Sequence, residues 1–403
     1  MASAGKARRV LIIVQNLPVP FDRRVWLEAT TLARAGYLVS VICPKMKGFV
    51  RSFETLEGVD IYRYGMPLDP KGRIGFVAEN LLALVRTFWL TLRVAWRGRG
   101  FDAIHACNPP ETYWTIGLFW KLFGRKRFLF DHHDLSPELF SVKFGGSEHS
   151  LLRRLLLLLE KATFRVADVS IATNESHRRI AVERGGMEPG RVFVVRSGPH
   201  LGRFRVHPAD PSWKRGKEHL VAFLGEMGSQ DGVDLLLQAL AVLRDEMGRE
   251  DFHCILVGGG THHDALIAEA ERLGVTGLCT FTGVVSDEDL CRILSSADIG
   301  VDPVPRNDWS DRSTMNKIME YMFFGLPIVS FDLVEARVSG GEAAMYVSGD
   351  CARDLATGIA SLLDDPARRE EMSRLGARRL QEELSWEHSV PHLLAAYDRL
   401  FTH

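Results

Sequence analysis

Two adjacent histidines, His132 and His133, stand at the end of an apolar run that begins near Arg127. Imidazole changes its charge near neutral pH, so a histidine at the carboxyl end of a strand is a candidate for acid, base or hydrogen-bonding chemistry on a ligand. Either histidine could instead be a capping group that only closes the strand. The pair marks one candidate site in the first half of the chain.

A second group of polar residues has the types and spacing of a site for phosphates and hydroxyls. Arg312 and Lys317 are cations, and Asn316 stands beside them where a helix is predicted to begin, so free backbone amides would add to their attraction for phosphate. Glu320 follows among apolar neighbours, and a carboxylate can accept hydrogen bonds from two adjacent hydroxyl groups. The alternatives are that both cations are surface charges and that Glu320 is a solvated helix residue.

Both groups must be positioned by a sheet, and short apolar runs alternate with helix-length amphipathic segments along the chain. This pattern is typical of parallel strands joined by crossover helices. At 403 residues the chain is long enough for two domains. One series of elements occupies residues 1–198 and a second occupies residues 219–385, and the stretch 199–218, rich in glycine, proline and charge, is predicted to be a linker. We expect residues 386–403 to form a helix that returns to the first domain.

The composition excludes several classes of protein. Apolar residues make up 46% and charged residues 25% of the chain, as in an ordinary globular protein, and a formal net charge of -1 argues against a nucleic-acid surface. The six cysteines include no CxxC pair, so they predict buried thiols in a reducing compartment and no zinc site. We therefore expect a cytoplasmic protein with no nucleic-acid partner.

Two apolar segments could bring the chain to a membrane. Residues 76–96 are long enough to span a bilayer, but Glu79, Arg86 and Arg93 would be costly in hydrocarbon, so a spanning helix is not expected. Residues 151–165 contain five consecutive leucines flanked by arginines, which could lie at an anionic membrane surface. The alternative is a buried packing helix with arginines that reach solvent. The first reading predicts a peripheral protein on the inner face of the cell membrane.

Residues 312–338 read RSTMNKIMEYMFFGLPIVSFDLVEARV, a polar loop, a helix, a Gly-Leu-Pro stop and a strand. This stretch resembles the retaining glycosyltransferases of family 4. The resemblance implies an α/β chain with the GT-B fold, in which two Rossmann-like domains face each other across a donor-binding cleft. Further matches follow in the order of that family, at NLPVPFD (16–22), DHHDL (131–135), FTGV (281–284), ADI (297–299) and SWE (385–387).

The resemblance assigns roles to several residues. It implies that His133 contacts the donor sugar near the reacting carbon, with His132 as the competing choice, and that Glu320 binds the ribose of a nucleotide sugar. Gly198 stands where the family has an Asn-Gly turn that lets backbone approach the phosphates. No metal and no cofactor are expected, because cations and helix ends would stabilise the departing diphosphate.

The predicted phosphate site departs from the family pattern. Glu226 and Asp231 stand where the family commonly carries two cations, and Arg312 replaces the first glutamate of its paired motif. We interpret this as a relocation of charge, in which Arg312 and Lys317, helped by Asn316, bind the diphosphate. The alternative is that the phosphates rest on backbone amides alone.

The loop before the first predicted helix is the expected acceptor side. Asp22 is placed to cap that helix, and Arg23 and Arg24 could hold a phosphate of a lipid-linked acceptor or simply pair with Glu28. The glycine pair that the family usually has in this loop is missing.

The resulting hypothesis is a retaining, metal-independent transfer of a hexose-type sugar from a UDP- or GDP-linked donor to a glycan or lipid-linked acceptor, in the synthesis of a cell-surface polysaccharide or glycoconjugate. One alternative is an inactive subunit that binds nucleotide sugar, which the missing cations make conceivable. Another is a nucleotide-sugar epimerase, against which the order of the motifs counts. A dehydrogenase is disfavoured because no GxGxxG follows Val14 or Leu224.

Overall fold

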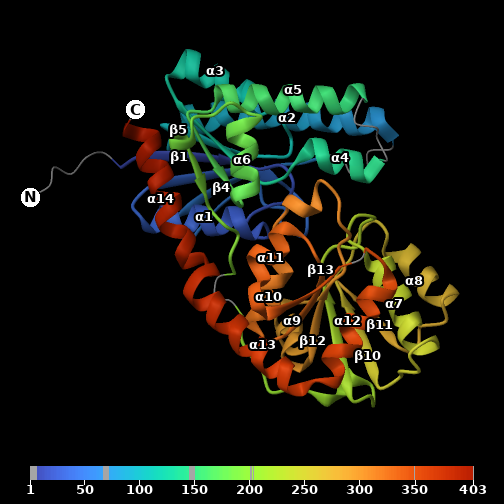
Figure 1. Cartoon of the computed structure of the whole chain (residues 1–403). Coiled ribbons are helices and arrows are strands. Elements are labelled where there is room, and N and C mark those ends of the chain that lie inside the picture. Colours follow the sequence, from blue (N-terminus) through green and yellow to red (C-terminus); the bar gives the residue numbers. More distant parts are fainter. Residues whose placement is uncertain are drawn as a thin grey trace, which may run out of the picture. The chain divides into compact units, whose positions relative to one another are not determined.

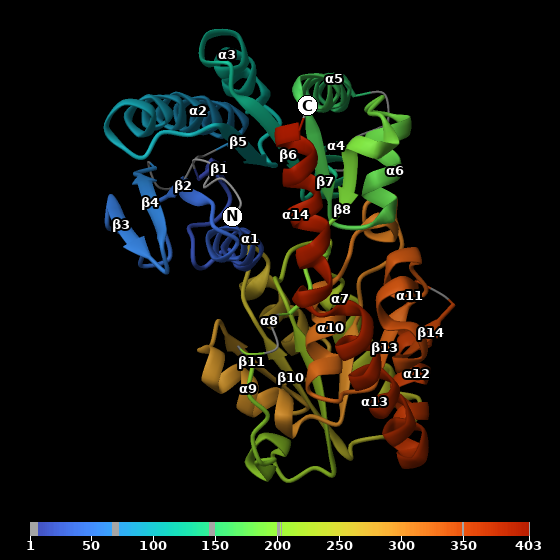
Figure 2. The ribbon, with the colours of Figure 1, turned by 90° about the vertical axis from the view of Figure 1, so that its left-hand side faces the viewer.

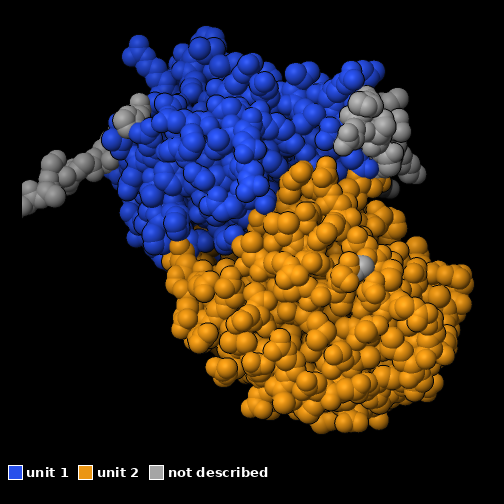
Figure 3. Space-filling model, viewed as in Figure 1, with its two compact units in different colours: residues 1–141, 146–197, 389–403 blue, residues 142–145, 198–388 orange. Residues whose placement is uncertain are grey.

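The structure is a computed structural model that describes residues 7–66, 72–144, 150–199, 202, 204–348 and 350–402. It divides into two compact units, which Figure 3 shows in different colours. Unit 1 comprises Met1–Ser141, Gly146–Ser197 and Ser389–His403, and unit 2 comprises Val142–Gly145 and Gly198–His388. The division after Ser197 lies within one residue of the predicted end of the first domain.

Unit 1 is built on an eight-stranded sheet with the order β3-β4-β2-β1-β5-β6-β7-β8 (Figure 1). Neighbouring strands pair in parallel, except that β3 runs antiparallel to β4. Strands in the middle of the sheet are buried on both faces, which explains their continuous apolar runs. The strands are β1 (Arg9–Ile13), β2 (Leu38–Pro44), β3 (Phe53–Leu56), β4 (Val59–Tyr64), β5 (Ala103–Cys107), β6 (Arg127–His132), β7 (Val169–Ala172) and β8 (Val192–Val194).

Three helices of unit 1, α2, α3 and α5, lie side by side at one face of this sheet (Figures 1 and 2). The rings of Phe88 in α2 and Phe119 in α3 are 4.9 Å apart, and Trp120 donates a hydrogen bond to Thr91 at 2.8 Å. None of the described helices is long and apolar enough to cross a membrane. The helices are α1 (Arg23–Arg34), α2 (Gly72–Arg97), α3 (Trp114–Gly124), α4 (Ser136–Phe144), α5 (Leu151–Val166), α6 (Glu175–Glu183) and the last part of α14 (Trp386–Thr402).

Unit 2 contains a six-stranded parallel sheet with the order β11-β10-β9-β12-β13-β14. The strands are β9 (His219–Leu224), β10 (Phe252–Val257), β11 (Cys279–Gly283), β12 (Ile299–Asp302), β13 (Ile328–Phe331) and β14 (Ala344–Val347). The helices are α7 (Val233–Asp245), α8 (His263–Arg272), α9 (Asp287–Ser296), α10 (Asn316–Phe323), α11 (Val334–Gly340), α12 (Ala352–Asp364) and α13 (Pro366–Arg379). Both units therefore have the doubly wound architecture that the alternating pattern predicts.

Each sheet has a point at which the strand order reverses. In unit 1 this point is at β1, between β2 and β5, and in unit 2 it is at β9, between β10 and β12. Open α/β sheets bind ligands beyond the carboxyl ends of the strands at such a switch point. The loops after β1, β5 and β6 in unit 1, and after β9 and β12 in unit 2, are thus the places where site residues are expected.

The described part of the predicted linker packs on unit 2. The backbone N–H groups of His207 and Asp210 donate to the hydroxyls of Ser295 and Ser296 in α9, both at 2.9 Å. Lys214 forms an ion pair with Asp298 at 2.9 Å. Residues 204–218 are therefore part of unit 2. Their composition predicts a separate linker, and this prediction is wrong for the described residues.

Helix α14 belongs to unit 1 from Ser389 onward. Leu393, Ala396 and Leu400 are buried, and so is Tyr397. The hydroxyl of Tyr397 lies 2.8 Å from Nδ1 of His105, a buried residue of β5. The end of the described chain thus covers the core of the first sheet.

Candidate functional site

Strand β6 ends at the paired histidines, and the carboxyl end of this strand carries the first part of the site. Asp131 is fully buried, whereas the side chain of His133 keeps 15% exposure. Nε2 of His133 hydrogen-bonds to Oδ2 of Asp131. Because an ionised carboxylate only accepts hydrogen bonds, His133 donates through Nε2, and its Nδ1 is the ring nitrogen left for a ligand.

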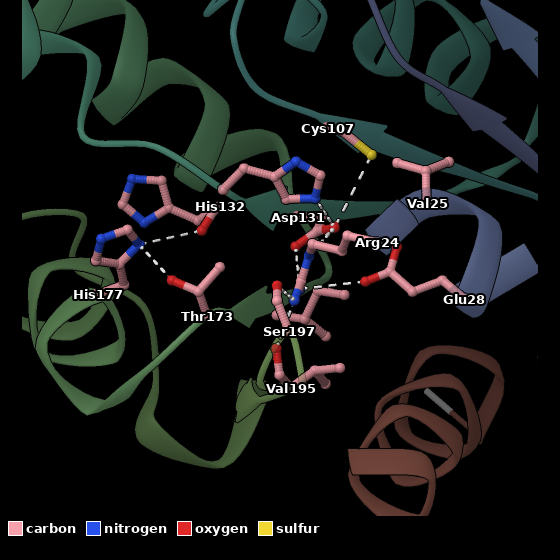
Figure 4. A network of polar contacts seen from close by, with 12 residues as sticks. Arg24, Val25, Glu28, Cys107, Asp131, His132, Thr173, His177, Val195 and Ser197 are labelled. Carbon is pink, nitrogen blue, oxygen red and sulfur yellow. Dashed lines mark hydrogen bonds and ion pairs between the residues drawn. The ribbon is translucent and has the colours of Figure 1, made fainter. Parts of the chain in front are cut away.

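Asp131 is held in turn by Arg24 of α1. Nε and Nη2 of Arg24 donate to the two carboxylate oxygens of Asp131 at 3.2 and 2.8 Å, which is a bidentate arrangement. Nη1 donates to the carbonyl oxygen of Val195 at 2.7 Å and to the hydroxyl of Ser197 at 3.0 Å. Figure 4 shows these contacts meeting at the guanidinium group. Arg24 therefore ties α1, β6 and the segment after β8 together.

The pKa values of two neighbouring carboxyl groups in this network shift in opposite directions. Burial by itself would raise the pKa of Asp131, but Arg24 and His133 hold that pKa well below its usual range. Burial raises the pKa of Glu28 well above its usual range, and the charge of Asp131 raises it further. Burial and the charge of Asp131 therefore favour the neutral form of Glu28, although Arg24, whose Nη2 lies 3.2 Å from Oε1 of Glu28, lowers its pKa. Asp131 is the carboxyl group of this pair that is held ionised beside His133.

The same network has residue types that can bind metals. Donor atoms of Glu28, Cys107, Asp131 and His133 all lie within 4.8 Å of one another. Burial raises the pKa of the Cys107 thiol well above its usual range and so disfavours a free thiolate there. Arg24 already supplies positive charge to Asp131, and a divalent cation would have to displace it. The donor set fits a carboxylate stabilised by arginine better than a metal site.

Asn108, which follows β5, fixes the backbone of His133. Its Oδ1 accepts hydrogen bonds from the backbone N–H groups of His133 and Asp134, at 2.6 and 3.2 Å, and its Nδ2 donates to Oε1 of Glu111 at 2.7 Å. Burial raises the pKa of Glu111 to about 7, although hydrogen bonds from Asn108 and Ser136 lower it. Neither Asn108 nor Glu111 is among the residues predicted from motifs. The signal that the sequence offers is their position on either side of two prolines, directly after a buried strand.

The structure separates the two adjacent histidines. His132 is fully buried, with its ring centroid 5.2 Å from that of Phe164 and 5.0 Å from that of His177. Burial lowers the pKa of His132 well below its usual range and that of His177 to about 4. His132 is therefore a neutral packing residue, next to His177 in Figure 4. His133, whose side chain is 15% exposed, is the member of the pair that a ligand can reach.

The predicted acceptor residues also occupy different environments. Oδ1 of Asp22 accepts from the backbone N–H of Val25 at 3.1 Å, so Asp22 caps α1 as predicted. Arg23 is exposed. Arg24 is buried and engaged with Asp131, and its proximity to Glu28 matches the predicted alternative that it pairs with that residue.

In unit 2, Lys317 of α10 reaches the turn that follows β9. Its side chain is 9% exposed, and Nζ lies 3.3 Å from Oδ1 of the fully buried Asp302 at the end of β12. Nζ also lies 4.7 Å from the ring centroid of Phe223. Burial raises the pKa of Asp302, whereas Lys317 lowers it. Lys317 thus brings a cation to the switch point of the sheet, next to a carboxylate that the sequence analysis does not identify.

The other predicted donor residues surround the start of α10. Arg312 ends the short 3-10 turn Ser310–Arg312, and its side chain is 38% exposed with Nη2 3.5 Å from the carboxylate of Asp308. Asn316, the first residue of α10, is exposed, and Glu320 follows one turn later, half-buried. The N-cap residue of α10, Met315, makes no capping hydrogen bond through its side chain. Asn316 and Glu320 are four residues apart and therefore share one side of this helix.

Gly198 has a packing reason to be glycine. A Cβ atom at this position would lie 2.1 Å from the carbonyl oxygen of Leu384 and 2.9 Å from the backbone nitrogen of Trp386. Any larger residue would collide with the backbone there. A close approach to phosphates is therefore not needed to explain Gly198.

The two carboxylates at the altered phosphate positions also differ. Oδ2 of Asp231 accepts from the backbone N–H of Gly228 at 2.9 Å and so closes the loop after β9. Burial raises the pKa of Asp231, and Lys317 lowers it. Glu226 is exposed to solvent. Asp231 thus has a local structural role that the comparison of motifs does not reveal.

Two doubly wound units in one chain define the GT-B class of fold, and known proteins match both halves. Residues 22–198 match a family model described as a glycosyl transferase 4-like domain. Residues 218–365 match a model described as glycosyl transferases group 1. The chain belongs to the family 4, or group 1, glycosyltransferases, as its motifs predict.

Known relatives and solved structures agree with this assignment. The D-inositol 3-phosphate glycosyltransferase of Rhodococcus opacus is 29% identical over 242 residues, which cover 57% of this chain and 52% of the relative. Sucrose-phosphate synthase from Thermosynechococcus elongatus gives a TM-score of 0.77 at 20% identity, over 98% of this chain and 99% of that one. Anabaena HepE in complex with UDP-glucose gives 0.71 at 15% identity, over 97% and 100%. These structures confirm the GT-B fold.

The match to curated relatives does not cover their whole length. Across four D-inositol 3-phosphate glycosyltransferases of Rhodococcus and Nocardia species, the chain spans between 51% and 66% of the relative. Family membership and fold are established by the combined matches. The reaction, the donor and the acceptor are proposals.

Proposed function

We propose that this chain is a retaining glycosyltransferase that moves a hexose-type sugar from a nucleotide-sugar donor to a hydroxyl group of a glycan or lipid-linked acceptor. The observation that carries the proposal is the His133–Asp131–Arg24 network, in which a buried ionised carboxylate fixes an accessible imidazole at a strand end. The UDP-glucose in the HepE complex supports a UDP-linked donor, with a GDP-linked donor as the alternative. The product would enter a cell-surface polysaccharide or glycoconjugate.

Each part of the donor has a residue of suitable chemistry in the proposal. Glu320 accepts hydrogen bonds from the ribose hydroxyls. Lys317 and Arg312, with Asn316 and the first amides of α10, stabilise the diphosphate as negative charge develops on it. His133 contacts the sugar near the carbon that reacts, through Nδ1.

The proposed reaction exchanges one glycosidic bond for another. The acceptor hydroxyl attacks the anomeric carbon on the face from which the nucleoside diphosphate departs, so the configuration is retained. The departing phosphate oxygen takes the proton of the attacking hydroxyl, and no separate base and no metal ion are required. The role of this chain's side chains is to bind, orient and stabilise charge.

Two single-residue variants test the proposal. Glu320→Gln should weaken the binding of UDP or GDP, measured by calorimetry, because the ribose loses its charged acceptor. His133→Ala should lower turnover with little change in nucleotide affinity. Glu370→Gln, an exposed residue of α13, is the matched control and should change neither quantity. Wild-type affinity and turnover in both site variants would overturn this assignment.

A second candidate function is a binding subunit without transfer activity. The positions that commonly carry cations hold Glu226 and Asp231, and the charge of Lys317 is shared with Asp302. Such a subunit would bind a nucleotide sugar but would release no nucleoside diphosphate, whether by transfer or by slow hydrolysis. Incubation with UDP-glucose and GDP-mannose, followed by chromatography of the nucleotides, separates the two functions.

A further inference from the structure

Helices α2, α3 and α5 present large apolar side chains to solvent. A large group of exposed apolar side chains on neighbouring helices of a folded protein marks an interaction site, whereas single exposed apolar residues are ordinary. More than half of the exposed large apolar side chains in the described residues lie on these three neighbouring helices, and they are between 37% and 81% exposed. We call them the α2–α3–α5 face: Leu81, Val85, Trp89, Trp96, Leu118, Leu122, Phe123, Leu151, Leu152, Leu155 and Leu158.

The spacing of these residues places them on one side of each helix. On α2, Leu81, Val85 and Trp89 recur every four residues, while Ala83 and Thr87 of the same helix are buried. On α5, Leu151, Leu155 and Leu158 follow the same periodicity, opposite the buried Glu160 and Phe164. An ordinary surface helix is apolar on its inner side only. The outer side of these helices therefore carries exposed apolar residues that no packing inside the described chain explains.

Cations border the α2–α3–α5 face. On α5, Arg154, Lys161 and Arg165 are exposed at positions i, i+7 and i+11, which form one row beside the leucines. On α2, Arg93 and Arg97 are exposed beside Trp96. This local positive charge contrasts with the net charge of -1 for the whole chain. The border is complementary to an anionic surface.

Acidic residues are nearly absent from the same helices. α3 has none, and the acidic residue of α5, Glu160, is buried and bonded to Arg184 at 2.8 and 2.6 Å. In α2 the only acid is Glu79, which is partly buried. Among the described residues of these helices, the partly exposed Glu79 is therefore the one carboxylate that could repel an anionic partner.

We propose that the α2–α3–α5 face binds the surface of a bilayer that contains anionic phospholipid. Leucine, phenylalanine and tryptophan side chains enter the boundary between headgroups and acyl chains, and the bordering arginines and lysine contact lipid phosphates. Tryptophan is the residue that favours this boundary. The proposal extends the hypothesis for residues 76–96 and 151–165 to α3, and it replaces a single amphipathic segment with a surface of three packed helices. It does not depend on the proposed transfer reaction.

Vesicle sedimentation with the full chain tests the electrostatic part. We expect binding to phosphatidylcholine vesicles that contain about 30% phosphatidylglycerol, much weaker binding to phosphatidylcholine alone, and release at high salt. The triple variant Arg154→Glu, Lys161→Glu, Arg165→Glu should lower the partition coefficient by on the order of 100-fold, because each cation contributes separately. Reversal of Arg368, Arg374 and Arg378, exposed cations of α13 in unit 2, is the matched control and should have little effect.

A second set of variants tests the apolar part. Leu122→Ser, Phe123→Ser, Leu155→Ser and Leu158→Ser together should abolish vesicle binding and leave the thermal unfolding temperature unchanged, because these side chains are exposed. Val284→Ser with Val334→Ser, exposed in unit 2, is the control. Lipids brominated on their acyl chains should quench tryptophan fluorescence in the wild type, and Trp89→Phe with Trp96→Phe should remove that quenching.

Three outcomes of these experiments would overturn the proposal. Equal binding by the wild type and the face variants would place the membrane contact elsewhere, and absence of binding to anionic vesicles at low salt would exclude it. A dimer that dissociates in the serine variants, without any vesicle binding, would show that a second copy of the chain covers this face. None of these readouts uses sugar transfer, so failure here is distinct from failure of the proposed function.

Discussion

Asp131 is the residue on which the site in unit 1 depends, because Arg24 and His133 both use its carboxylate. A fully buried carboxylate stays ionised only when its charge is compensated, and the bidentate contact with Arg24 provides that compensation. Burial and, after it, the charge of Asp131 raise the pKa of the neighbouring Glu28. If Asp131 lost its charge, this second contribution would disappear, and Arg24 would favour ionisation of Glu28 in its place.

This exchange of charge predicts non-additive variants. At neutral pH, Glu28→Gln should change the free energy of unfolding by less than about 1 kcal/mol, because burial and Asp131 favour the neutral form of Glu28, which Gln resembles. Asp131→Asn should cost a moderate amount, since Glu28 then becomes the partner of Arg24. The double variant leaves a buried guanidinium without any carboxylate and should cost about 3 to 5 kcal/mol. Urea unfolding of all four proteins measures the coupling, and strictly additive costs would contradict it.

Glu111 predicts a pH dependence of stability. Its pKa is about 7 in the folded protein and has the usual value of 4.5 when unfolded. Between these values the folded state keeps a proton that the unfolded state releases, so this residue's contribution to stability falls as the pH rises through the window and is constant above it. Glu111→Gln does not titrate. Its stability relative to the wild type should therefore increase by up to about 3 kcal/mol between about pH 5 and pH 8 in urea unfolding. A constant difference would show that Glu111 is ionised throughout.

At the scale of elements, the ion pair between Lys317 and Asp302 joins α10 to the end of β12. Lys317→Ala removes a proposed phosphate ligand and also leaves a buried carboxylate unpaired. We expect a drop in turnover of roughly 30-fold to several hundred-fold, as for the loss of an oxyanion donor, together with a lower unfolding temperature. Adding Asp302→Asn should restore the unfolding temperature but not turnover. Recovery of both the unfolding temperature and turnover would show that Lys317 supports turnover only by stabilising the fold.

Helix α14 contributes to unit 1 by packing and by one buried hydrogen bond. Tyr397→Phe should cost about 1 kcal/mol in the free energy of unfolding, because only the contact with His105 is lost. Tyr397→Ala should cost about 3 to 5 kcal/mol, since it also leaves a cavity in the core. Denaturant unfolding of the two variants separates the contribution of the hydrogen bond from that of ring packing. Equal costs for both variants would mean that packing of the ring contributes nothing.

The elements also show how far the sequence alone could lead. The strands inside each sheet are apolar on both faces, so their runs are conspicuous, whereas the edge strands β3 and β14 are only partly buried. The positions of His133 and Glu320 followed from motifs. The pairing of Arg24 with Asp131 joins residues 107 positions apart, and no local pattern encodes which charged groups meet across a sheet. Burial of Arg24, and the roles of Asn108 and Asp302, could be found only from the folded chain.

At the scale of the whole molecule, the charge network of unit 1 predicts that catalysis does not require a metal ion. Arg24 occupies the place at Asp131 that a divalent cation would take. Treatment with EDTA should therefore leave the initial rate of transfer unchanged, measured with donor and acceptor in metal-free buffer. Loss of activity that manganese restores would contradict this expectation. Unfolding temperatures recorded in the same samples would reveal any structural effect of the chelator.

The division of the chain into units has a consequence for its synthesis. Residues 198–388, which form most of unit 2, are translated before the part of α14 that belongs to unit 1. At about 5 to 20 residues per second, the ribosome needs roughly 10 to 40 s for this stretch. During that time the nascent first sheet lacks Tyr397 and Leu400, and the apolar surface that they later cover is open to chaperones and proteases. A chain arrested before Ser389 would remain in that vulnerable state, even with every residue of the proposed donor site already made.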